Sequence, residues 1–110
     1  MTTKITTWNV NGIRAALGKG LKEWVLQQSP DMMCLQEIKA KTEQLSAEQM
    51  DFPGYGISWN PAERPGYSGV ATMCRRQPEQ VALGLGVERF DVEGRVIRTR
   101  HPGFFLYNIY

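Results

Sequence analysis

The sequence of 110 residues has few of the side chains that bind transition metals or form disulfides. It contains one histidine, His101, and two cysteines, Cys34 and Cys74, which lie far apart in the chain. Structural zinc sites need closely spaced Cys and His ligands, so the sequence disfavours a site of that kind. Both cysteines lie inside apolar runs, and we therefore expect reduced, buried thiols rather than a disulfide framework.

Long hydrophobic runs and a strong charge bias are also missing. No run is long enough to cross a bilayer, and no apolar signal core follows the first residues, which favours a cytoplasmic protein without a membrane partner. The formal net charge is only +2, which is too small an excess to indicate a nucleic acid-binding protein by itself. A chain of this length forms one modest core, so we expect no separate second domain, and nothing indicates an obligate protein partner.

The most informative feature that is present is an apolar run at 32–35 that ends abruptly in Gln36 and Glu37. Its short length favours a buried strand over a helix. Functional groups gather at strand ends in sheets that are covered on both faces, so Glu37 is a candidate ligand for Mg²⁺, which prefers oxygen ligands. The plain alternative is a solvated glutamate or one that pairs with Lys39.

The segment before this strand completes a strand–helix–strand pattern. Residues 4–10 have the composition of a strand that ends at a turn signal, and residues 17–28 show apolar positions at helical spacing. A crossover of this kind makes its two strands parallel. We therefore expect Asn9, Asn11 and Glu37 to lie at the same edge of the sheet.

The second half of the chain changes to a strand pattern. Before it, a polar segment at 42–50 is compatible with a helix, and Ser46 and Gln49 have the spacing of a capping box. The architecture predicted from the residues is α/β, a mixed sheet with helices at its start and antiparallel strands later. Because the last run stops without a turn, a polar tail or a cap, we expect the chain to be part of a longer protein. The later strands are predicted at 55–59, 69–74, 81–85, 96–99 and 104–110, with turns at 60–61, 64–66, 91–94 and 101–103.

Four motifs resemble the exodeoxyribonuclease III type of apurinic/apyrimidinic endonuclease. They occur in the expected order: WNVNGIRA at 8–15, LQE at 35–37, GYSGV at 66–70 and EGRV at 93–96. The resemblance runs along the whole chain but covers only the N-terminal part of that family's domain. It implies the N-terminal half of a four-layered α/β sandwich, with two mixed β-sheets flanked by helices, and one endonuclease/exonuclease/phosphatase domain to which residues 1–110 belong. The family's Asp-x-Asn motif and its Asp-His pair do not occur in these residues.

The resemblance also implies roles for individual residues. Glu37 would bind the catalytic Mg²⁺, or Mn²⁺ in its place, and Asn9 would orient the site or touch the metal. Asn11 would lie behind the metal ligands, since some relatives have an aspartate there and an amide is a weaker ligand. Tyr110 matches a tyrosine that addresses the scissile phosphate, which makes it the catalytic candidate.

A further set of residues would face DNA. The motifs favour DNA contacts for Arg14 and Tyr67, since an arginine offers a planar fork to phosphate. For Arg95 a solvated surface position is an equally good interpretation. For Lys39 an ion pair with Glu37 or another carboxylate is at least as good as a DNA contact.

The function implied is Mg²⁺-dependent hydrolysis of phosphodiester bonds in damaged DNA during base excision repair. The substrate would be double-stranded DNA with abasic sites or 3′ ends, cleaved by endonuclease, 3′-exonuclease or 3′-phosphatase activity. The alternatives are another phosphoesterase of the same superfamily, acting on inositol phosphates, phospholipids or RNA, and a non-catalytic nucleic acid-binding relative. Residues 1–110 alone lack the family's water-activating groups, so we expect them to be inactive by themselves.

Overall fold

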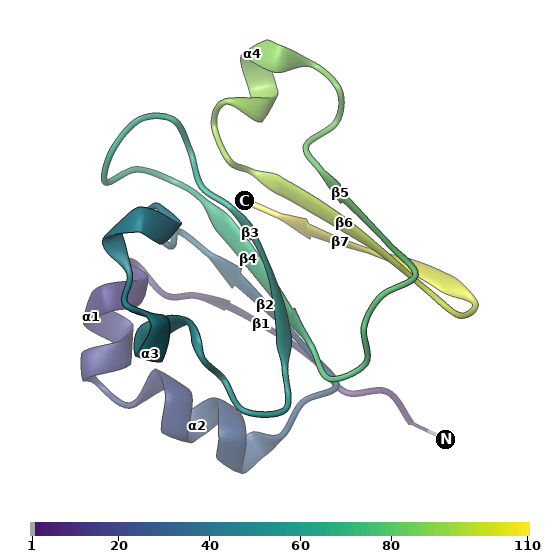
Figure 1. The fold of residues 1–110 in the computed structure, drawn as a ribbon. Helices are drawn as coiled ribbons and strands as arrows, with labels where there is room; N and C mark the ends of the chain where they lie inside the picture. Colours follow the sequence, from purple (N-terminus) through teal and green to yellow (C-terminus); the bar gives the residue numbers. More distant parts are fainter. Residues whose placement is uncertain (1) are drawn as a thin grey trace.

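The computed structural model describes residues 2–110, which form two β-sheets packed face to face (Figure 1). The first sheet has the order β1-β2-β4-β3, and the second has the order β5-β6-β7. Only β1 and β2 are parallel, as predicted for the crossover, and the other pairs are antiparallel. The strands are β1 (Ile5–Asn9), β2 (Met32–Gln36), β3 (Gly56–Asn60), β4 (Val70–Cys74), β5 (Gln80–Leu83), β6 (Val96–His101) and β7 (Phe104–Ile109).

The prediction of one mixed sheet from the residues was wrong, whereas the two sheets implied by the family resemblance are confirmed. Strands β3 and β4 add to the first sheet, and the last three strands form a sheet of their own. The sequence pattern could not reveal this division because consecutive antiparallel strands look alike whether or not the chain crosses to a second sheet.

The helices lie on the face of the first sheet that is turned away from the second sheet, apart from α4 (Figure 1). The single helix predicted at 17–28 is in fact two helices. Gly20 separates them with a left-handed φ of 98°, a conformation that glycine adopts without steric cost. The helical segments are α1 (Ile13–Gly18), α2 (Leu21–Gln28), the short 3₁₀ helix η1 (Thr42–Gln44), α3 (Ala47–Met50) and α4 (Glu88–Asp91).

Other local predictions had mixed outcomes. The capping box at α3 is confirmed, because the Gln49 N–H donates to Ser46 Oγ at 3.0 Å and the Ser46 N–H donates to Gln49 Oε1 at 2.9 Å. The turn expected at 91–94 follows a short helix, α4, that the sequence did not indicate. No helix among residues 2–110 is long and apolar enough to cross a membrane.

Strand β2 is buried on both faces, which explains its uninterrupted apolar sequence. Met33 and Leu35 pack with Leu21 and Val25 of α2 in the core between the first sheet and the helices. Cys34 of β2 is a free, buried thiol, as is Cys74 of β4, which confirms the prediction for both cysteines. Burial raises the pKa of each thiol to about 11.

Candidate active site

The ends of β1 and β2 meet at one edge of the first sheet. The N–H groups of Val10 and Gly12 donate to the carbonyl oxygens of Gln36 and Glu37 at 3.0 and 2.8 Å. The parallel pairing continues in this way past both strands, so the polar residues that follow each strand lie side by side. The prediction that Asn9, Asn11 and Glu37 share one edge is confirmed by this pairing.

A short polar network surrounds the Glu37 carboxylate. The Lys39 ammonium lies 3.4 Å from Glu37 Oε1 and donates to Asn11 Oδ1 at 2.6 Å. The Asn9 side-chain oxygen accepts the Asn11 N–H at 3.0 Å. The predicted Lys39–Glu37 ion pair is therefore present. Asn11 contacts Lys39, not the Glu37 carboxylate. This arrangement anchors Asn9 and leaves its amide nitrogen available to the carboxylate.

The electrostatics of the network keep Glu37 ionised. Hydrogen bonding from Asn9 is the largest cause that lowers the pKa of the Glu37 carboxyl below its usual range, and Lys39 and Tyr110 act in the same direction. The Glu37 side chain keeps 21% of its surface exposed. The carboxylate is thus both charged and open to a cation from solvent.

The backbone around this network is strained. Asn11, Glu37, Lys39 and Ser68 all have positive φ angles between 47° and 58°. Non-glycine residues rarely adopt this left-handed region, and such residues cluster at functional sites, where the surrounding structure holds them. Here the Lys39 N–H donates to the Ser68 carbonyl oxygen at 2.9 Å, which joins the end of β2 to the loop before β4.

At two glycines of the motifs, neighbouring atoms lie so close that a side chain would not fit. A Cβ atom on Gly69 would lie 2.7 Å from Ile38 Cγ1. A Cβ on Gly94 would lie 2.5 Å from the Ala62 nitrogen, where the loop before β6 touches the loop after β3. Both glycines also have positive φ angles. Gly69 lets the residue before β4 lie against Ile38, which follows Glu37, and Gly94 lets the second sheet approach the first at this end.

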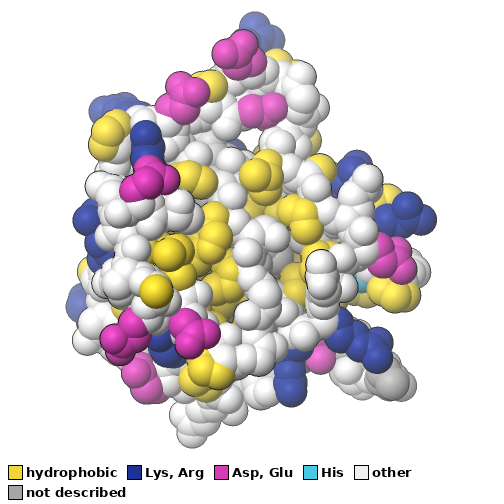
Figure 2. All heavy atoms as spheres, in the orientation of Figure 1, with side chains coloured by type: hydrophobic (Ala, Val, Ile, Leu, Met, Phe, Trp, Pro, Cys, Tyr) yellow, Lys and Arg dark blue, Asp and Glu magenta, His cyan; other side chains and the backbone are white. Residues whose placement is uncertain are grey.

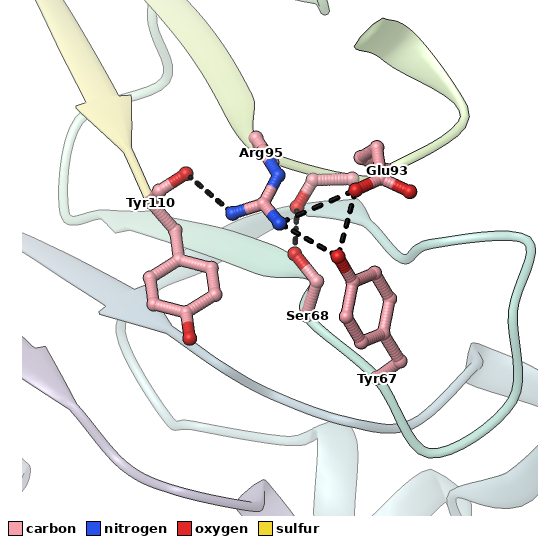
Figure 3. Close-up of polar contacts among 6 residues, drawn as sticks. Tyr67, Ser68, Glu93, Arg95 and Tyr110 are labelled. Atoms are coloured by element: carbon pink, nitrogen blue, oxygen red, sulfur yellow. Dashed lines mark hydrogen bonds and ion pairs between the residues drawn. The ribbon is translucent and has the colours of Figure 1, made fainter. Parts of the chain in front are cut away.

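A second polar cluster joins the two sheets beside the first (Figure 3). The Tyr67 hydroxyl donates to Glu93 Oε1 at 2.7 Å, and Arg95 Nη2 donates to both of these groups, at 2.7 Å to the hydroxyl and 3.2 Å to the carboxylate. The hydrogen bond from Tyr67 is the largest cause that lowers the pKa of Glu93, followed by Arg95. Tyr67 and Arg95, both candidates for DNA contacts, are therefore partners in one partly exposed cluster.

Tyr110 connects this cluster with the Glu37 network. Its N–H donates to the Arg95 carbonyl oxygen at 2.8 Å, and Arg95 Nη1 donates to the Tyr110 carbonyl oxygen at 3.2 Å. Figure 3 shows the Tyr110 hydroxyl at the end of the ring that points away from Arg95. Since Tyr110 also helps to lower the pKa of Glu37, the ring extends from the second sheet toward the carboxylate on the first. Arg14 lies apart, exposed on α1.

The sequence reasoning missed two residues at this end of the molecule. Glu93 holds both Tyr67 and Arg95, although it was noted only as part of a motif. Asn108 is 2% exposed and bonds to several groups of the first sheet. An amide inside the aromatic and aliphatic run 104–110 was the available signal, because a polar residue at an inward position needs partners.

The donors at Glu37 are of the right type for a hard cation. Mg²⁺ prefers oxygen ligands such as a carboxylate, usually keeps several waters and binds substrate phosphate. The side-chain oxygens of Asn9 and Asn11 already accept hydrogen bonds, from the Asn11 N–H and from Lys39. Among residues 2–110, no group of three or more His, Cys, Asp or Glu side chains is gathered to hold a metal ion. Glu37 is the single anionic ligand that these residues offer at this site, with Asn9 beside it.

Comparison with known proteins identifies close relatives along almost the whole chain. DNA repair nuclease APEX1 of Danio rerio is 44% identical over 109 residues, which are 97% of this chain and 35% of that protein. The exodeoxyribonuclease of Bacillus subtilis is 38% identical over 108 residues, which are 97% of this chain and 42% of that protein. The chain thus spans well under half the length of these relatives.

Solved structures match the fold as well. An AP endonuclease from Archaeoglobus fulgidus superposes with a TM-score of 0.81 at 33% identity, over 99% of this chain and 41% of that one. The 3′ phosphatase NExo from Neisseria, bound to product DNA hairpin, superposes with a TM-score of 0.82 at 31% identity, over 99% of this chain and 41% of that one. The Endonuclease/Exonuclease/phosphatase family profile matches residues 6–110, and the chain therefore belongs to this family and is homologous to AP endonucleases and exonucleases of DNA repair.

Proposed function

We propose that this chain is the N-terminal part of a single domain that hydrolyses phosphodiester bonds in damaged DNA with the help of Mg²⁺ or Mn²⁺. The observation that carries the proposal is the convergence of Glu37, Asn9 and Tyr110 at one end of the two sheets. The relative from Danio rerio is a DNA repair nuclease, and the structure of the 3′ phosphatase NExo from Neisseria holds a product DNA hairpin. The free, buried thiols suit a reducing compartment such as the cytoplasm.

In the proposed reaction the residues at the Glu37 edge would hold the metal ion and position the scissile phosphate. A bound metal ion supplies Lewis-acid stabilisation of the phosphoryl oxygen and of the leaving alkoxide. Glu37 would be its anionic ligand. Asn9 orients the carboxylate, and Lys39 pairs with Glu37 and donates to Asn11. The Tyr110 hydroxyl donates a hydrogen bond to a non-bridging oxygen of the phosphate, where negative charge develops in the transition state.

The residues proposed to contact DNA flank this edge. Arg14 lies at the start of α1 directly after the turn that bonds to Glu37, and Tyr67 and Arg95 lie on the other side. Contacts from such side chains to the phosphate backbone position a duplex without reading its sequence. That property suits an enzyme that recognises a missing base or a 3′ end.

The test is cleavage of a duplex oligonucleotide with one abasic site by the full-length protein, with Mg²⁺ and with chelator. Glu37→Gln keeps the shape of the side chain but removes its charge, and we expect it to lower the cleavage rate by at least about 10²-fold. Glu79→Gln is the matched control, since this glutamate is half exposed and pairs with Arg100 away from the proposed site.

Near-normal cleavage by Glu37→Gln would contradict the proposal. Cleavage of RNA, phospholipids or inositol phosphates in place of abasic DNA would favour another phosphoesterase of the superfamily. DNA binding without cleavage of any substrate would favour a non-catalytic relative. Product analysis separates cleavage at abasic sites from removal of 3′ nucleotides or 3′ phosphates.

A further inference from the structure

A buried amide ties β7 to the first sheet. The Asn108 side chain, 2% exposed, donates from Nδ2 to the Ala71 and Leu35 carbonyl oxygens at 2.9 and 3.2 Å and to Thr72 Oγ1 at 3.1 Å. These acceptors belong to β2 and β4, the two central strands of the first sheet. The amide thus reaches across the interface between the sheets and bonds to the central strands β2 and β4 of the first sheet.

The same amide also connects to the residue next to Glu37. Asn108 Oδ1 accepts a hydrogen bond from Gln36 Nε2 at 2.8 Å, and Gln36 Nε2 donates again to Thr7 Oγ1 at 2.8 Å. A continuous chain of side-chain hydrogen bonds therefore runs from β1 through β2 to β7. Both polar atoms of the Asn108 side chain are thus hydrogen-bonded, Oδ1 in this chain and Nδ2 to β2 and β4.

The position of Asn108 along β7 relates it to Tyr110. Side chains two residues apart on a strand point to the same face, so Asn108 and Tyr110 both face the first sheet. The backbone of Tyr110, directly after β7, is held by Arg95, directly before β6 of the same sheet. Within residues 2–110, the hydrogen bonds between side chains of β7 and groups of the first-sheet strands all involve Asn108.

Holding the two sheets together does not by itself explain why residue 108 is an asparagine. An apolar side chain of similar size would hold the two sheets together at no desolvation cost, whereas a buried amide is costly unless all its partners are in place. Hydrogen bonds are directional, however. An amide with all its hydrogen bonds made fixes both the position of β7 along β2 and the distance between these strands. That restriction matters where two reacting groups come from different sheets.

We infer that Asn108 is a positioning residue, which fixes the Tyr110 hydroxyl relative to the Glu37 carboxylate and acts through Tyr110 without touching the substrate. The inference rests on the proposed function. Gln36 shares the task, because it joins Asn108 to the residue that precedes Glu37. Misplacement of a catalytic group by about 1 Å costs roughly 10² in rate, so the loss of this link should be visible in turnover.

The experiment measures kcat and KM of the full-length protein on abasic duplex DNA at a temperature at which all variants are folded. Asn108→Leu should lower kcat about 10²-fold and leave KM near the wild-type value. Thr99→Val is the control, since Thr99 is 1% exposed and loses a hydrogen bond to His101 on the same inner face but has no link to Glu37 or Tyr110. It should retain the wild-type kcat.

Coupling to Tyr110 separates positioning from general destabilisation. Tyr110→Phe should lower kcat strongly in the wild-type and Thr99→Val backgrounds but add little in the Asn108→Leu background, because residues that act as a unit are not additive. In a crystal structure of Asn108→Leu the Tyr110 hydroxyl should be displaced from Glu37. Gln36→Met offers a second variant that leaves the bonds from Asn108 to β4 intact, in case Asn108→Leu does not fold.

Equal kcat values for the Asn108→Leu and Thr99→Val variants, or independent effects of Asn108→Leu and Tyr110→Phe, would overturn the inference and leave the proposed function standing. If Asn108→Leu does not fold, full turnover by Gln36→Met overturns it in the same way. If wild-type protein does not cleave abasic DNA, or Glu37→Gln cleaves it normally, the proposed function fails and the inference falls with it.

Discussion

Arg95 and Tyr110 hold each other through both main chain and side chain. The Tyr110 N–H donates to the Arg95 carbonyl oxygen at 2.8 Å, while the Arg95 guanidinium donates back to the Tyr110 carbonyl oxygen at 3.2 Å and lies 5.2 Å from the centre of its ring. The same guanidinium bonds to Tyr67 and Glu93. Arg95 therefore has a role in shaping the site whether or not it also meets DNA.

Substitution of Arg95 can separate these two roles. Arg95→Lys keeps the positive charge but loses the fork that joins Tyr110, Tyr67 and Glu93. We expect kcat to fall by roughly tenfold or more, the effect of losing a charge-assisted hydrogen bond, while the salt dependence of DNA binding stays near that of wild type. Arg95→Gln should lower kcat and also flatten the salt dependence. Full activity of Arg95→Lys would show that only the charge matters.

The DNA contacts proposed for Arg14 and Tyr67 predict a change in binding. Arg14→Gln should weaken the affinity for duplex DNA and reduce the slope of log K against log salt by about 1, because one phosphate contact releases about one counterion. Tyr67→Ala should weaken binding too. Arg76→Gln is the control. Arg76 is exposed and follows Cys74, which pairs with Met32 at the start of β2, whereas Glu37 follows the end of β2. Arg76 therefore lies at the opposite end of the first sheet from Glu37. Unchanged affinity and slope for Arg14→Gln would contradict a DNA-facing position.

The sequence was most informative where structure is local. The uniformly apolar β2 and the crossover before it could be predicted, because a buried parallel strand has no solvated face and its sequence shows this directly. The meeting of Asn9 and Glu37 followed from that topology. The break between α1 and α2 was missed, although Gly20 carries the signal, because an isolated glycine is often tolerated within a helix.

The contacts between the two sheets could not be predicted from local patterns. Tyr67 meets Glu93 across 26 positions and Arg95 across 28 positions, and no periodicity relates them. Asn108 bonds to partners 36 to 73 positions away. The role proposed for Tyr110 came only from the family resemblance, since an aromatic residue after a strand is otherwise an ordinary packing residue. Long-range polar contacts of this kind are set by the fold as a whole.

The two cysteines should be unreactive in the folded protein. With pKa values of about 11 caused by burial, roughly one thiol in a thousand is ionised at pH 8, and the thiolate is the nucleophile. We expect very slow reaction of Cys34 and Cys74 with a disulfide-exchange reagent such as dithiodipyridine, followed by rapid reaction of both in denaturant. Rapid reaction of either thiol in the native state would show that β2 and β4 open readily.

His101 should make stability depend on pH. It is 4% exposed, stacks on Phe104 at 5.1 Å and bonds to Thr99, and burial lowers its pKa, with nearby Glu79 acting in the opposite direction. Above about pH 6.5, the value for an unfolded chain, the native and unfolded states both hold it neutral. Below that pH the unfolded chain binds the proton first, so stability falls as the pH drops toward the lower native pKa.

Denaturant midpoints at pH 7.5 and 5.5 test this effect. The wild-type midpoint should be lower at pH 5.5, and His101→Gln should show a smaller difference between the two values. The carboxylates with lowered pKa, Glu37 and Glu93, titrate below this window and do not obscure it. Equal differences in wild type and His101→Gln would assign the pH dependence to another group.

The second sheet exposes apolar surface that should cause association of the polypeptide 1–110 when it is prepared by itself. Phe105, Tyr107 and Ile109 on the outer face of β7 are 51%, 49% and 63% exposed, and β7 is an edge strand of its sheet among the described residues. Figure 2 shows further hydrophobic side chains over β3 and β5, with Lys and Arg side chains around the periphery. Exposed edges and contiguous apolar patches both promote association.

Sedimentation velocity at several concentrations measures this association. Ile109→Lys should shift the 1–110 polypeptide toward monomer, because it places a charge on the exposed edge. Leu26→Lys is the control. Leu26 is 39% exposed on α2, on the other side of the first sheet, and the substitution adds the same charge.

In a nicking assay with Mg²⁺, we expect no cleavage of abasic DNA by the polypeptide 1–110. Glu37 is the single anionic ligand at the proposed metal site, and residues 1–110 lack the family's Asp-x-Asn motif and Asp-His pair. A monodisperse monomer that turns over abasic DNA would contradict both expectations and would place the complete catalytic apparatus within these residues.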